Sequence, residues 1–427
     1  MQENLSPTRS RTAFSWALYD WANSAFATTV MAGFFPVFFK QYWAGELSVT
    51  DSTFWLGAAN SFAAVLVVLL APVIGVWSDR AGLKKRLLFV FAALGVVMTG
   101  GLFLVQHGFW QLALLLYVLA VLGFSSANVS YDALLPFVVG EGSPERLSAL
   151  GFAFGYLGGG ILFAFNVWMV LQPQTFGLAD SAEAVRWSFL TVAAWWALFS
   201  VPLLLFVREP VTPAHRHSAA SVWHDLLDTW RELRTLPMAF TFLIAYWLYI
   251  DGVDTIVRMA VDYGLALGFE SNDLLTALLI TQFVGFPAAL AFGHLGVRIG
   301  AKRGISVAIV VYILVVFWAW RMQSSSEFYA LAVVIGLVQG GIQALSRALF
   351  ARLIPEQRAG RFFGLYNMMG KFAAVVGPVM VGWAAVLFDS PRAGILSVLI
   401  LFLLAAVLLS RVDVEQGERQ AAQAGTT

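Results

Sequence analysis

The chain contains no cysteine among its 427 residues, and it carries few charges. Without cysteine it can have no disulfide framework, no thiolate nucleophile and no Cys-based metal site. Charged residues make up 12% of the sequence, whereas a soluble domain typically has about 25%. Hydrophobic residues reach 59%, and the mean hydropathy is +0.77. No soluble fold could bury this much apolar surface, so we expect a protein whose solvent is lipid.

Several catalytic and nucleotide-binding signatures are also missing. There is no G-x-x-x-x-G-K-[ST] loop for ATP, and the five histidines are scattered without an H-E-x-x-H motif. Asp251 and Asp254 share one predicted helix, unlike an aspartyl protease dyad from two helices. An integral membrane enzyme is therefore only a remote alternative. We expect no cofactor, no metal site and no nucleic-acid partner.

Long apolar runs predict an all-α integral membrane fold. A bilayer core needs about 20 apolar residues of helix. Twelve such runs occur, at 14–39, 53–77, 87–106, 109–138, 147–171, 186–207, 237–267, 273–297, 304–320, 327–350, 361–387 and 393–410. The seventh run is interrupted by four charges.

The basic residues predict the orientation. With both termini on one side, most of the 26 Lys and Arg residues fall on that side. The loops of the opposite side carry only Lys40, Arg186, Arg321 and Arg392. Basic residues concentrate in cytoplasmic loops, so both termini are predicted to be cytoplasmic. In a bacterium this places the chain in the cytoplasmic (inner) membrane.

A repeated motif predicts two related halves. Residues 75–85 read G-V-W-S-D-R-A-G-L-K-K, and residues 293–303 read G-H-L-G-V-R-I-G-A-K-R. Each copy lies between two apolar runs, the second and third or the eighth and ninth. We expect two pseudo-symmetric six-helix halves at 1–207 and 237–411. A cytoplasmic linker at 208–236, with an amphipathic stretch from Val222 to Leu233, would join them, and a disordered cytoplasmic tail would follow at 412–427.

This architecture and the pattern G-x-x-x-D-R-x-G-x-K-K resemble the major facilitator superfamily. Three further strings narrow the resemblance: Asp20-Trp21-Ala22-Asn23-Ser24, Asp251-Gly252-Val253-Asp254-Thr255, and Gly364-Leu365-Tyr366-Asn367 leading to Gly370-Lys371-Phe372. They are similar to bacterial permeases related to the fungal vacuolar effluxer of autophagy, which releases amino acids. The resemblance implies a transporter in which the halves rock about a central site.

The resemblance also implies a gate at the repeated motif. The loop acid of the superfamily, here Asp79, lies against the cytoplasmic start of helix eleven and helps to lock the inner side. A carboxylate gains free energy near a helix N-terminus. Arg80 would pair with an acid across the gate, and Gly75 and Gly82 would shape the turn. In the second copy Val297 replaces the acid. The alternative is a basic cytoplasmic loop without a gating role.

Polar residues inside the spans recur at helical spacing in spans one, four, seven and ten. Charge within a membrane is costly and usually marks function or a buried pair. In the superfamily these helices line the central cavity, and span eleven adds two polar residues. The candidate substrate or ion ligands are Asp20, Asn23, Asp251, Asp254, Arg258, Asn367 and Lys371.

Three interpretations of these residues remain open. Lys371 could bind a carboxylate, and Asp20, Asp251 or Asp254 an ammonium group, which would suit an amino acid. Buried acids could instead carry a coupling proton, and Na⁺ is the other possible coupling ion. Structural pairing is the third interpretation, with Arg258 neutralising acids of its own helix and Asp20 pairing with Lys371. Asp132 and Arg347, near the cytoplasmic ends of their spans, are candidates for gate salt bridges.

The sequence therefore predicts a monomeric secondary transporter that moves a small solute, an amino acid or similar zwitterion, outward and with proton coupling. The main alternative is a multidrug or lipophilic-cation exporter. Such an exporter would need an acid-rich, aromatic pocket and would have no use for Lys371.

Overall fold

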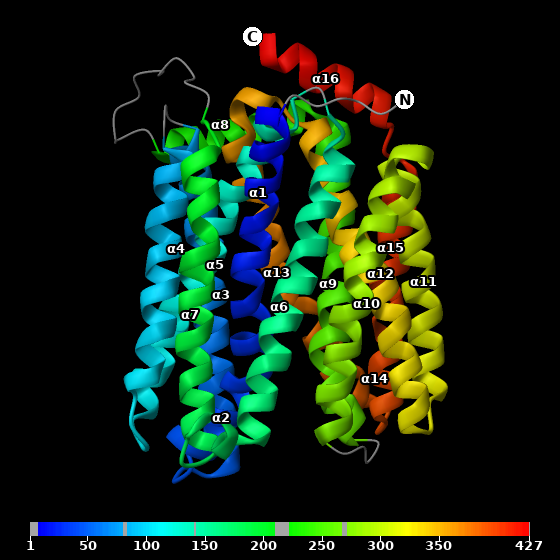
Figure 1. The fold of residues 1–427 in the computed structure, drawn as a ribbon. Coiled ribbons are helices and arrows are strands. Elements are labelled where there is room, and N and C mark those ends of the chain that lie inside the picture. The colour runs from blue at the N-terminus through cyan, green and yellow to red at the C-terminus, as the bar shows by residue number, and fades with distance from the viewer. Residues whose placement is uncertain (1–6, 80–82, 141, 210–221, 267–270, 427) are drawn as a thin grey trace.

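The computed structural model describes residues 7–79, 83–140, 142–209, 222–266 and 271–426. Every regular element in these residues is a helix (Figure 1). Among them, twelve helical segments are long and apolar enough to cross a membrane, close to the predicted spans. These are α1 (Pro7–Ala25) with η1 (Phe26–Phe34), α2 (Phe35–Phe38) and η2 (Phe39–Trp43), then α3 (Val49–Ser78), α4 (Lys84–Gly101), α5 (Trp110–Val139), α6 (Pro144–Leu171), α7 (Ser181–Phe206), α9 (Pro237–Ala266), α10 (Ser271–Ile299), α11 (Ala301–Arg321), α12 (Ser325–Leu353), α13 (Ala359–Leu387), and α14 (Pro391–Ser397) with α15 (Leu399–Ser410).

Apolar sequence and local capping explain where these helices lie. In lipid, a chain must satisfy its backbone hydrogen bonds internally, and a helix does so within one segment. Polar caps set the starts: Ser324 and Glu327 form a capping box at α12, and Asp180 accepts a hydrogen bond from the Glu183 amide at 2.8 Å at α7. Gly300, with φ of 89°, permits the sharp turn between α10 and α11.

The first span departs from a regular α-helix. Phe26–Phe34 and Phe39–Trp43 are π-helical, a conformation that is often found at functional sites. Thr28, in the first π-helical segment, accepts a hydrogen bond from the Gln282 side chain of α10 at 3.1 Å. The irregular part of the first span therefore contacts α10, a helix far away in the sequence.

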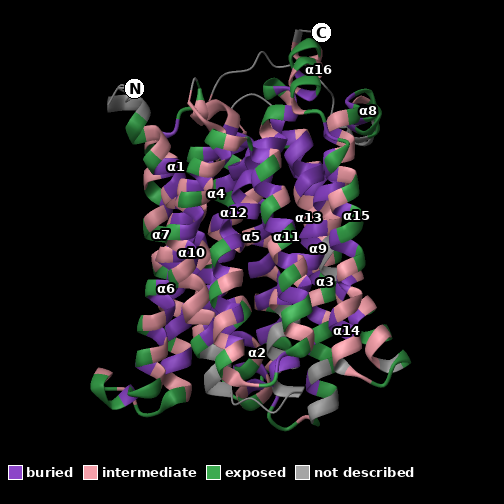
Figure 2. Cartoon of the chain, turned by 90° about the vertical axis from the view of Figure 1, so that its right-hand side faces the viewer, coloured by how far each residue is buried: buried purple, intermediate pink, exposed green. Residues whose placement is uncertain are grey.

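The buried apolar residues form two large clusters. One is drawn from residues 16–207, and the other, apart from Ala133, from residues 233–412. The two groups meet where α3 packs beside α13, and where α6 packs beside α10 and α12. The start of α1, the amphipathic α8 (Val222–Thr235) and α16 (Val414–Thr426) all lie at one end, which we call the termini end (Figure 1). Buried residues are gathered most densely toward this end (Figure 2).

The predicted disordered tail is wrong, because residues 414–426 form α16. Asp413 accepts a hydrogen bond from the Gln416 amide at 3.0 Å and so caps the helix start. Glu418 pairs with Arg352 at 2.6 Å, and Ala421 is buried. The Glu-, Gln- and Ala-rich sequence favours helix, and these contacts with the bundle stabilise it. By contrast, the predicted amphipathic stretch in the linker corresponds to α8.

Candidate functional site

Asp79 joins the two groups of helices at the termini end. It directly follows α3, and its carboxylate accepts hydrogen bonds from the amides of Gly360 at 2.7 Å and Arg361 at 2.8 Å. These amides lie in the first turn of α13, where the helix dipole favours an anion. The expected position of the acid against helix eleven is therefore confirmed. Burial raises the pKa of the Asp79 carboxyl above its ordinary value of 3.8, while Lys84 and the two amides oppose this rise.

Gly75 is the other gating residue that the structure describes. A side chain at Gly75 would collide with the Gly360 carbonyl oxygen and lie 3.0 Å from the Gly364 Cα. The absence of a side chain therefore allows α3 and α13 to approach closely. Arg80 and Gly82, which were predicted to act with Asp79, lie outside the described residues.

The cation that pairs with Asp79 is Lys84, which the sequence reasoning did not single out. Its Nζ lies 3.1 Å from the Asp79 carboxylate and donates to the Ser78 carbonyl oxygen at 3.0 Å. Only 2% of the Lys84 side chain is exposed. Lys84 occupies the first position of the basic pair that closes the repeated motif, so the motif held the signal.

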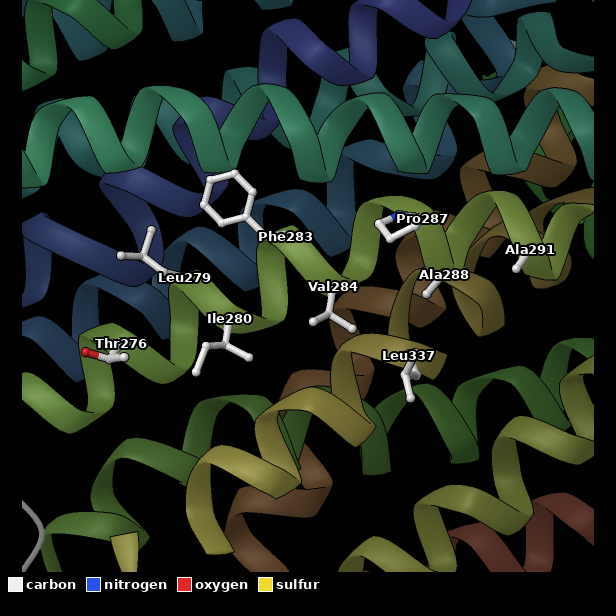
Figure 3. Close-up of a pocket in the computed structure, with 9 residues that line it drawn as sticks. All are labelled: Thr276, Leu279, Ile280, Phe283, Val284, Pro287, Ala288, Ala291 and Leu337. Carbon is white, nitrogen blue, oxygen red and sulfur yellow. The ribbon is translucent and has the colours of Figure 1, made fainter. Parts of the chain in front are cut away.

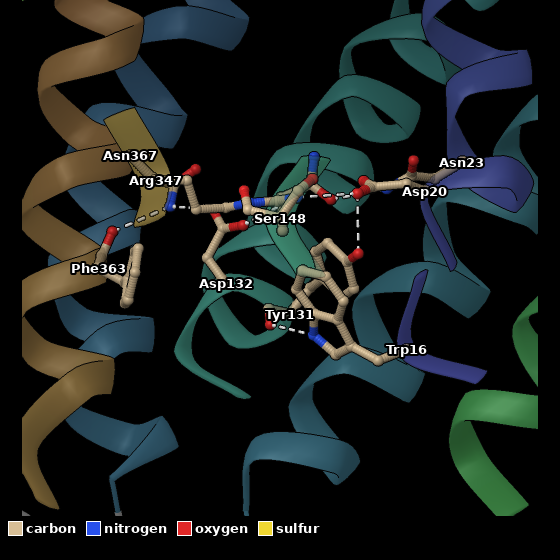
Figure 4. A network of polar contacts seen from close by, with 10 residues as sticks. Trp16, Asp20, Asn23, Tyr131, Asp132, Ser148, Arg347, Phe363 and Asn367 are labelled. Atoms are coloured by element: carbon tan, nitrogen blue, oxygen red, sulfur yellow. Dashed lines mark hydrogen bonds and ion pairs between the residues drawn. The ribbon is translucent and has the colours of Figure 1, made fainter. Parts of the chain in front are cut away.

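A second connection centres on Arg347 of α12 (Figure 4). Its guanidinium nitrogens lie 3.2 Å from an Asp20 oxygen of α1 and 3.2 Å from an Asp132 oxygen of α5. It also donates to the Ser148 hydroxyl at 2.9 Å and to the Ser148 carbonyl oxygen at 3.1 Å. Asp132 and Arg347, the two candidates for gate salt bridges, therefore pair with each other. The cationic partner of Asp20 is Arg347 and not Lys371, the partner considered in the structural interpretation.

Two asparagines extend this network. Asn23 of α1 donates to the Asn128 side chain of α5 at 2.7 Å. Asn367 of α13 donates to the second oxygen of Asp132 at 3.0 Å. Asp132 is thus held by two helices of the C-terminal part, α12 and α13. The structure places Asn367 at this connection, and Asn23 one turn along α1 from Asp20.

A third connection between the two groups of helices lies at the solvent-exposed edge of the termini end, which we call the rim. Glu145 of α6 is 2% exposed and forms an ion pair with Arg352 of α12 at 2.6 Å. Arg352 also pairs with Glu418 of α16 at 2.6 Å. Because Arg352 is 41% exposed, this connection is more open to water than the Asp79 and Arg347 sites.

Asp251 joins two helices of the same C-terminal group. Its carboxylate accepts hydrogen bonds from the Gly377 amide of α13 at 2.9 Å and from the Thr255 hydroxyl at 3.4 Å. Asp251 is 1% exposed. A side chain at Gly377 would lie 2.8 Å from this carboxylate, so the glycine permits the contact. These bonds anchor α9 against α13 and leave Asp251 little contact with solvent.

Asp254 and Lys371 are half-buried and more accessible. Asp254 is close enough to the phenols of Tyr156 and Tyr312 to interact with them electrostatically. Tyr156 comes from α6, so Asp254 faces the junction of the two groups of helices. Lys371 follows Asn367 by one helical turn on α13, which places the two side chains on one face. The Arg258 side chain lies outside the described residues.

A groove along α10 is lined by none of these charged side chains (Figure 3). It has a volume of about 680 Å³ and is lined by apolar side chains of α10, with Leu337 of α12. Thr276 is its one polar lining residue, and Phe283 and Leu337 are exposed. With no charged group to bind a zwitterion, this groove is an apolar outer surface and not the polar site.

Known proteins are similar to this chain in sequence and in fold. A family model described as "Vacuole effluxer Atg22 like" matches residues 43–422. The chain belongs to this family. It is 38% identical to the MFS-type transporter YxiO of Bacillus subtilis, over 94% of both chains. It is 23% identical to autophagy-related protein 22 of Kluyveromyces lactis, over 92% of this chain and 85% of that protein.

The fold agrees with this assignment. The structure of the human organic anion transporter MFSD10 is similar with a TM-score of 0.74 at 16% identity, covering 95% of this chain and 100% of that one. The family member is thus a multi-pass membrane transporter of the major facilitator superfamily, and not an enzyme. The resemblance noted from the sequence is confirmed.

Proposed function

We propose that this Atg22-like protein exports an amino acid or similar small zwitterion by alternating access, with proton coupling. The halves at 1–207 and 237–411 would rock as units about a central site, joined by the linker at 208–236. The protein would act as a monomer in a bacterial cytoplasmic membrane, with both termini in the cytoplasm. Asp79, Gly75, Arg80 and Gly82 would belong to the inner gate.

One observation carries the mechanical part of this proposal. Among the described residues, three charged contacts join the two groups of helices at the termini end: Asp79 accepts a hydrogen bond from the Gly360 amide of α13, Arg347 pairs with Asp20 and Asp132, and Arg352 pairs with Glu145. A transporter must break such contacts when it opens that end, and form them when it closes. The structure therefore supports a state sealed at the termini end.

The basic residues support a cytoplasmic termini end. The described basic residues of this end include Lys84, Lys302, Arg352 and Arg358, whereas Arg186, Arg321 and Arg392 belong to the opposite end. Because basic residues accumulate on the cytoplasmic side, the sealed end is the inner one. The central site then faces outward in this state.

The nature of the polar groups supports a zwitterion. Asp254 and Lys371, on α9 and α13, provide an acid and a base that are both half-buried. An amino acid needs a partner for its ammonium and another for its carboxylate, and such charged hydrogen bonds are the strong ones. Matching the substrate's two charges inside the bundle reduces the cost of removing them from water.

A specific observation also favours the second candidate, an organic-cation exporter. Asp20 and Asp132 lie beside the aromatic rings of Trp16 and Tyr131, an acid-rich and aromatic combination. Such a pocket suits a cation. Lys371 would then have no direct role in binding.

Transport by purified protein in proteoliposomes tests the two candidates together. Labelled amino acids, and organic cations that lack a carboxylate, would be offered under imposed pH or Na⁺ gradients. We expect zwitterion uptake that depends on the pH gradient, and Lys371→Met and Asp254→Asn should each raise its KM at least tenfold. Asp389→Asn, an exposed acid with the same charge change as Asp254→Asn, is the matched control. Transport of cations alone, unaffected by Lys371→Met, would favour the exporter.

The absence of cysteine makes the orientation easy to test. Ala422→Cys marks α16 at the termini end, and Gln323→Cys marks the opposite end, between α11 and α12; both positions are exposed. In intact cells a membrane-impermeant maleimide should label Gln323→Cys alone. Labelling of Ala422→Cys instead would reverse the proposed orientation.

A further inference from the structure

The pocket that holds Arg347 is built by the N-terminal group of helices alone. Its two acids are Asp20 of α1 and Asp132 of α5, and Ser148 of α6 adds a hydroxyl and a carbonyl oxygen. Three aromatic rings enclose the guanidinium carbon, at 4.9 Å for Trp16, 5.4 Å for Tyr131 and 4.4 Å for Phe152. Arg347 contributes the guanidinium but comes from α12, on the other side of the junction.

The pocket walls are fixed by contacts that do not involve Arg347. The Tyr131 hydroxyl donates to Asp20 at 2.8 Å, and the Trp16 indole donates to the Tyr131 carbonyl oxygen at 3.2 Å (Figure 4). The Trp16 and Tyr131 rings are stacked at 4.4 Å. When the two groups of helices separate, these contacts can remain. Asp20 and the two rings are therefore preorganised to bind a planar cation, whereas Asp132 loses the hydrogen bond from Asn367 of α13 together with Arg347.

Gly151 makes room for the occupant. A side chain there would collide with the Asp20 carboxylate and lie 3.0 Å from an Arg347 nitrogen. The arrangement of oxygens and rings matches a guanidinium, which uses several planar donors and also stacks on aromatic faces. The ligand chemistry of the pocket is thus shown by a group already bound in it.

Opening of the termini end creates a charge imbalance in this pocket. In the sealed state two carboxylates share one guanidinium. Withdrawal of Arg347 leaves Asp20 and Asp132 facing each other without their cation, and removing one partner from a buried ion pair is strongly unfavourable. An incoming cation of the same shape would restore the original charge.

We propose that the N-terminal half contains a binding site for a guanidinium-type organic cation, which Arg347 fills in the sealed state and a cationic substrate fills when the termini end is open. The transport part rests on the proposed function, and it narrows the substrate to an amino acid or amine with a guanidinium group. The substrate would replace Arg347 on Asp20 and Asp132 and so favour opening.

The site itself can be tested without transport. Arg347→Ala removes the group equivalent to ethylguanidinium, so we would follow the thermal unfolding of the purified full-length variant with added ethylguanidinium at millimolar concentrations. Ethylurea, neutral and of the same shape, is the control ligand. We expect a saturable rise in Tm with ethylguanidinium only, lost when Asp20→Asn and Asp132→Asn are added. Arg352→Ala, which removes an arginine from the rim, should show no such rise.

A response equal for both ligands, or equal in Arg352→Ala, would overturn the site. The substrate class is tested separately on the wild-type protein, so that a poorly folded variant does not decide the outcome. In proteoliposomes, arginine should compete with a labelled substrate at a concentration at least tenfold lower than citrulline, its neutral isostere. Equal competition would reject the substrate class. Failure of all transport would reject the proposed function, while the ethylguanidinium response would still report on the site.

Discussion

The two copies of the repeated motif lie at equivalent places but secure their junctions differently. In the first copy, Asp79 reaches across and caps the start of α13. In the second copy Val297 takes the place of the acid and is 42% exposed. The helix beside the second copy, α6, begins with its own cap, because Ser143 accepts a hydrogen bond from the Arg146 amide at 3.3 Å.

The difference shows how a duplicated element can diverge. The residue directly before α13 is Arg358, which has no side-chain oxygen, whereas Ser143 directly precedes α6. The start of α13 therefore receives its carboxylate from Asp79, on the other side of the junction, and this cap is broken whenever the halves separate. The start of α6 keeps its cap in any state. We therefore expect the first junction to act as a latch and the second to act as a packed pivot.

The largest expected effect follows removal of the latch. Asp79→Ala removes the cap of α13 and leaves Lys84, 2% exposed, without its carboxylate. Lys84 lies on the same side of the junction as Asp79, so what the sealed state loses is the pair of hydrogen bonds from the Gly360 and Arg361 amides. At about 1.5–3 kcal/mol for each hydrogen bond to a charged group, the ratio of sealed to open molecules should fall at least about 100-fold. Spin labels at Arg86→Cys and Arg303→Cys, exposed positions on α4 and α11, would report that ratio as a distance distribution.

Val297→Ala at the equivalent place is the control for this comparison. It changes an exposed side chain and should leave the distance distribution unchanged. If both substitutions shifted it equally, the two copies would not differ as latch and pivot.

A smaller effect is expected at the rim of the second junction. Arg352→Met removes the ion pair of Glu145, which is 2% exposed but keeps a hydrogen bond from the Ser143 hydroxyl at 2.8 Å. That bond remains and Arg352 is partly solvated. We therefore expect the sealed state to lose about 1–3 kcal/mol relative to the open state, as read from the same distance distribution. Arg231→Met, at an exposed pair with Asp228 within α8, is the matched control. A shift as large as that of Asp79→Ala would make the second junction an equal latch.

The sequence predicted the fold and the latch because both signals are local. Apolar runs define spans without knowledge of their neighbours, and the repeated motif contains both Asp79 and Lys84. The partners of Asp79 on α13 entered only through the family resemblance. The Arg347 pocket depends on Asp20, Asp132 and Ser148, which come from three helices, and no periodicity pairs them with residue 347.

Other differences have equally specific causes. Asp251 was expected at the substrate site, but a glycine of α13, Gly377, allows its carboxylate to bond the backbone within the same group of helices. The helical tail was missed because its polar composition also fits disorder. The contact between Glu418 and Arg352, which favours the helix, joins residues far apart in the sequence.

The cap of α6 offers a finer test of the pivot. Ser143→Ala removes an N-cap, which typically costs about 1 kcal/mol. Since this cap lies within one group of helices, and Glu145 keeps its ion pair with Arg352 when the Ser143 hydroxyl is lost, the substitution should lower the free energy of unfolding without changing the ratio of sealed to open molecules. Thermal unfolding and the spin-label distance would be measured together. Ser48→Ala, at the cap of α3 on the opposite end, is the control and should also lower the free energy of unfolding without changing the distance distribution. A change of the distance distribution in Ser143→Ala alone would show that α6 takes part in the latch.

The smallest effect is expected when the missing acid is restored. Val297→Asp gives the second copy the residue that the first has at Asp79. The new carboxylate finds no vacant helix start, because Ser143 already caps α6 and Pro144 has no amide hydrogen to donate. It would also lie near Glu145, whose side chain would be 3.3 Å from a Cβ placed at the neighbouring Gly296. We therefore expect the free-energy difference between the sealed and open states, read from the spin-label distances, to change by less than about 0.5 kcal/mol, as for an ordinary exposed substitution. A gain in the sealed state would mean that the acid alone makes a latch, and that the cap of the neighbouring helix does not decide which junction opens.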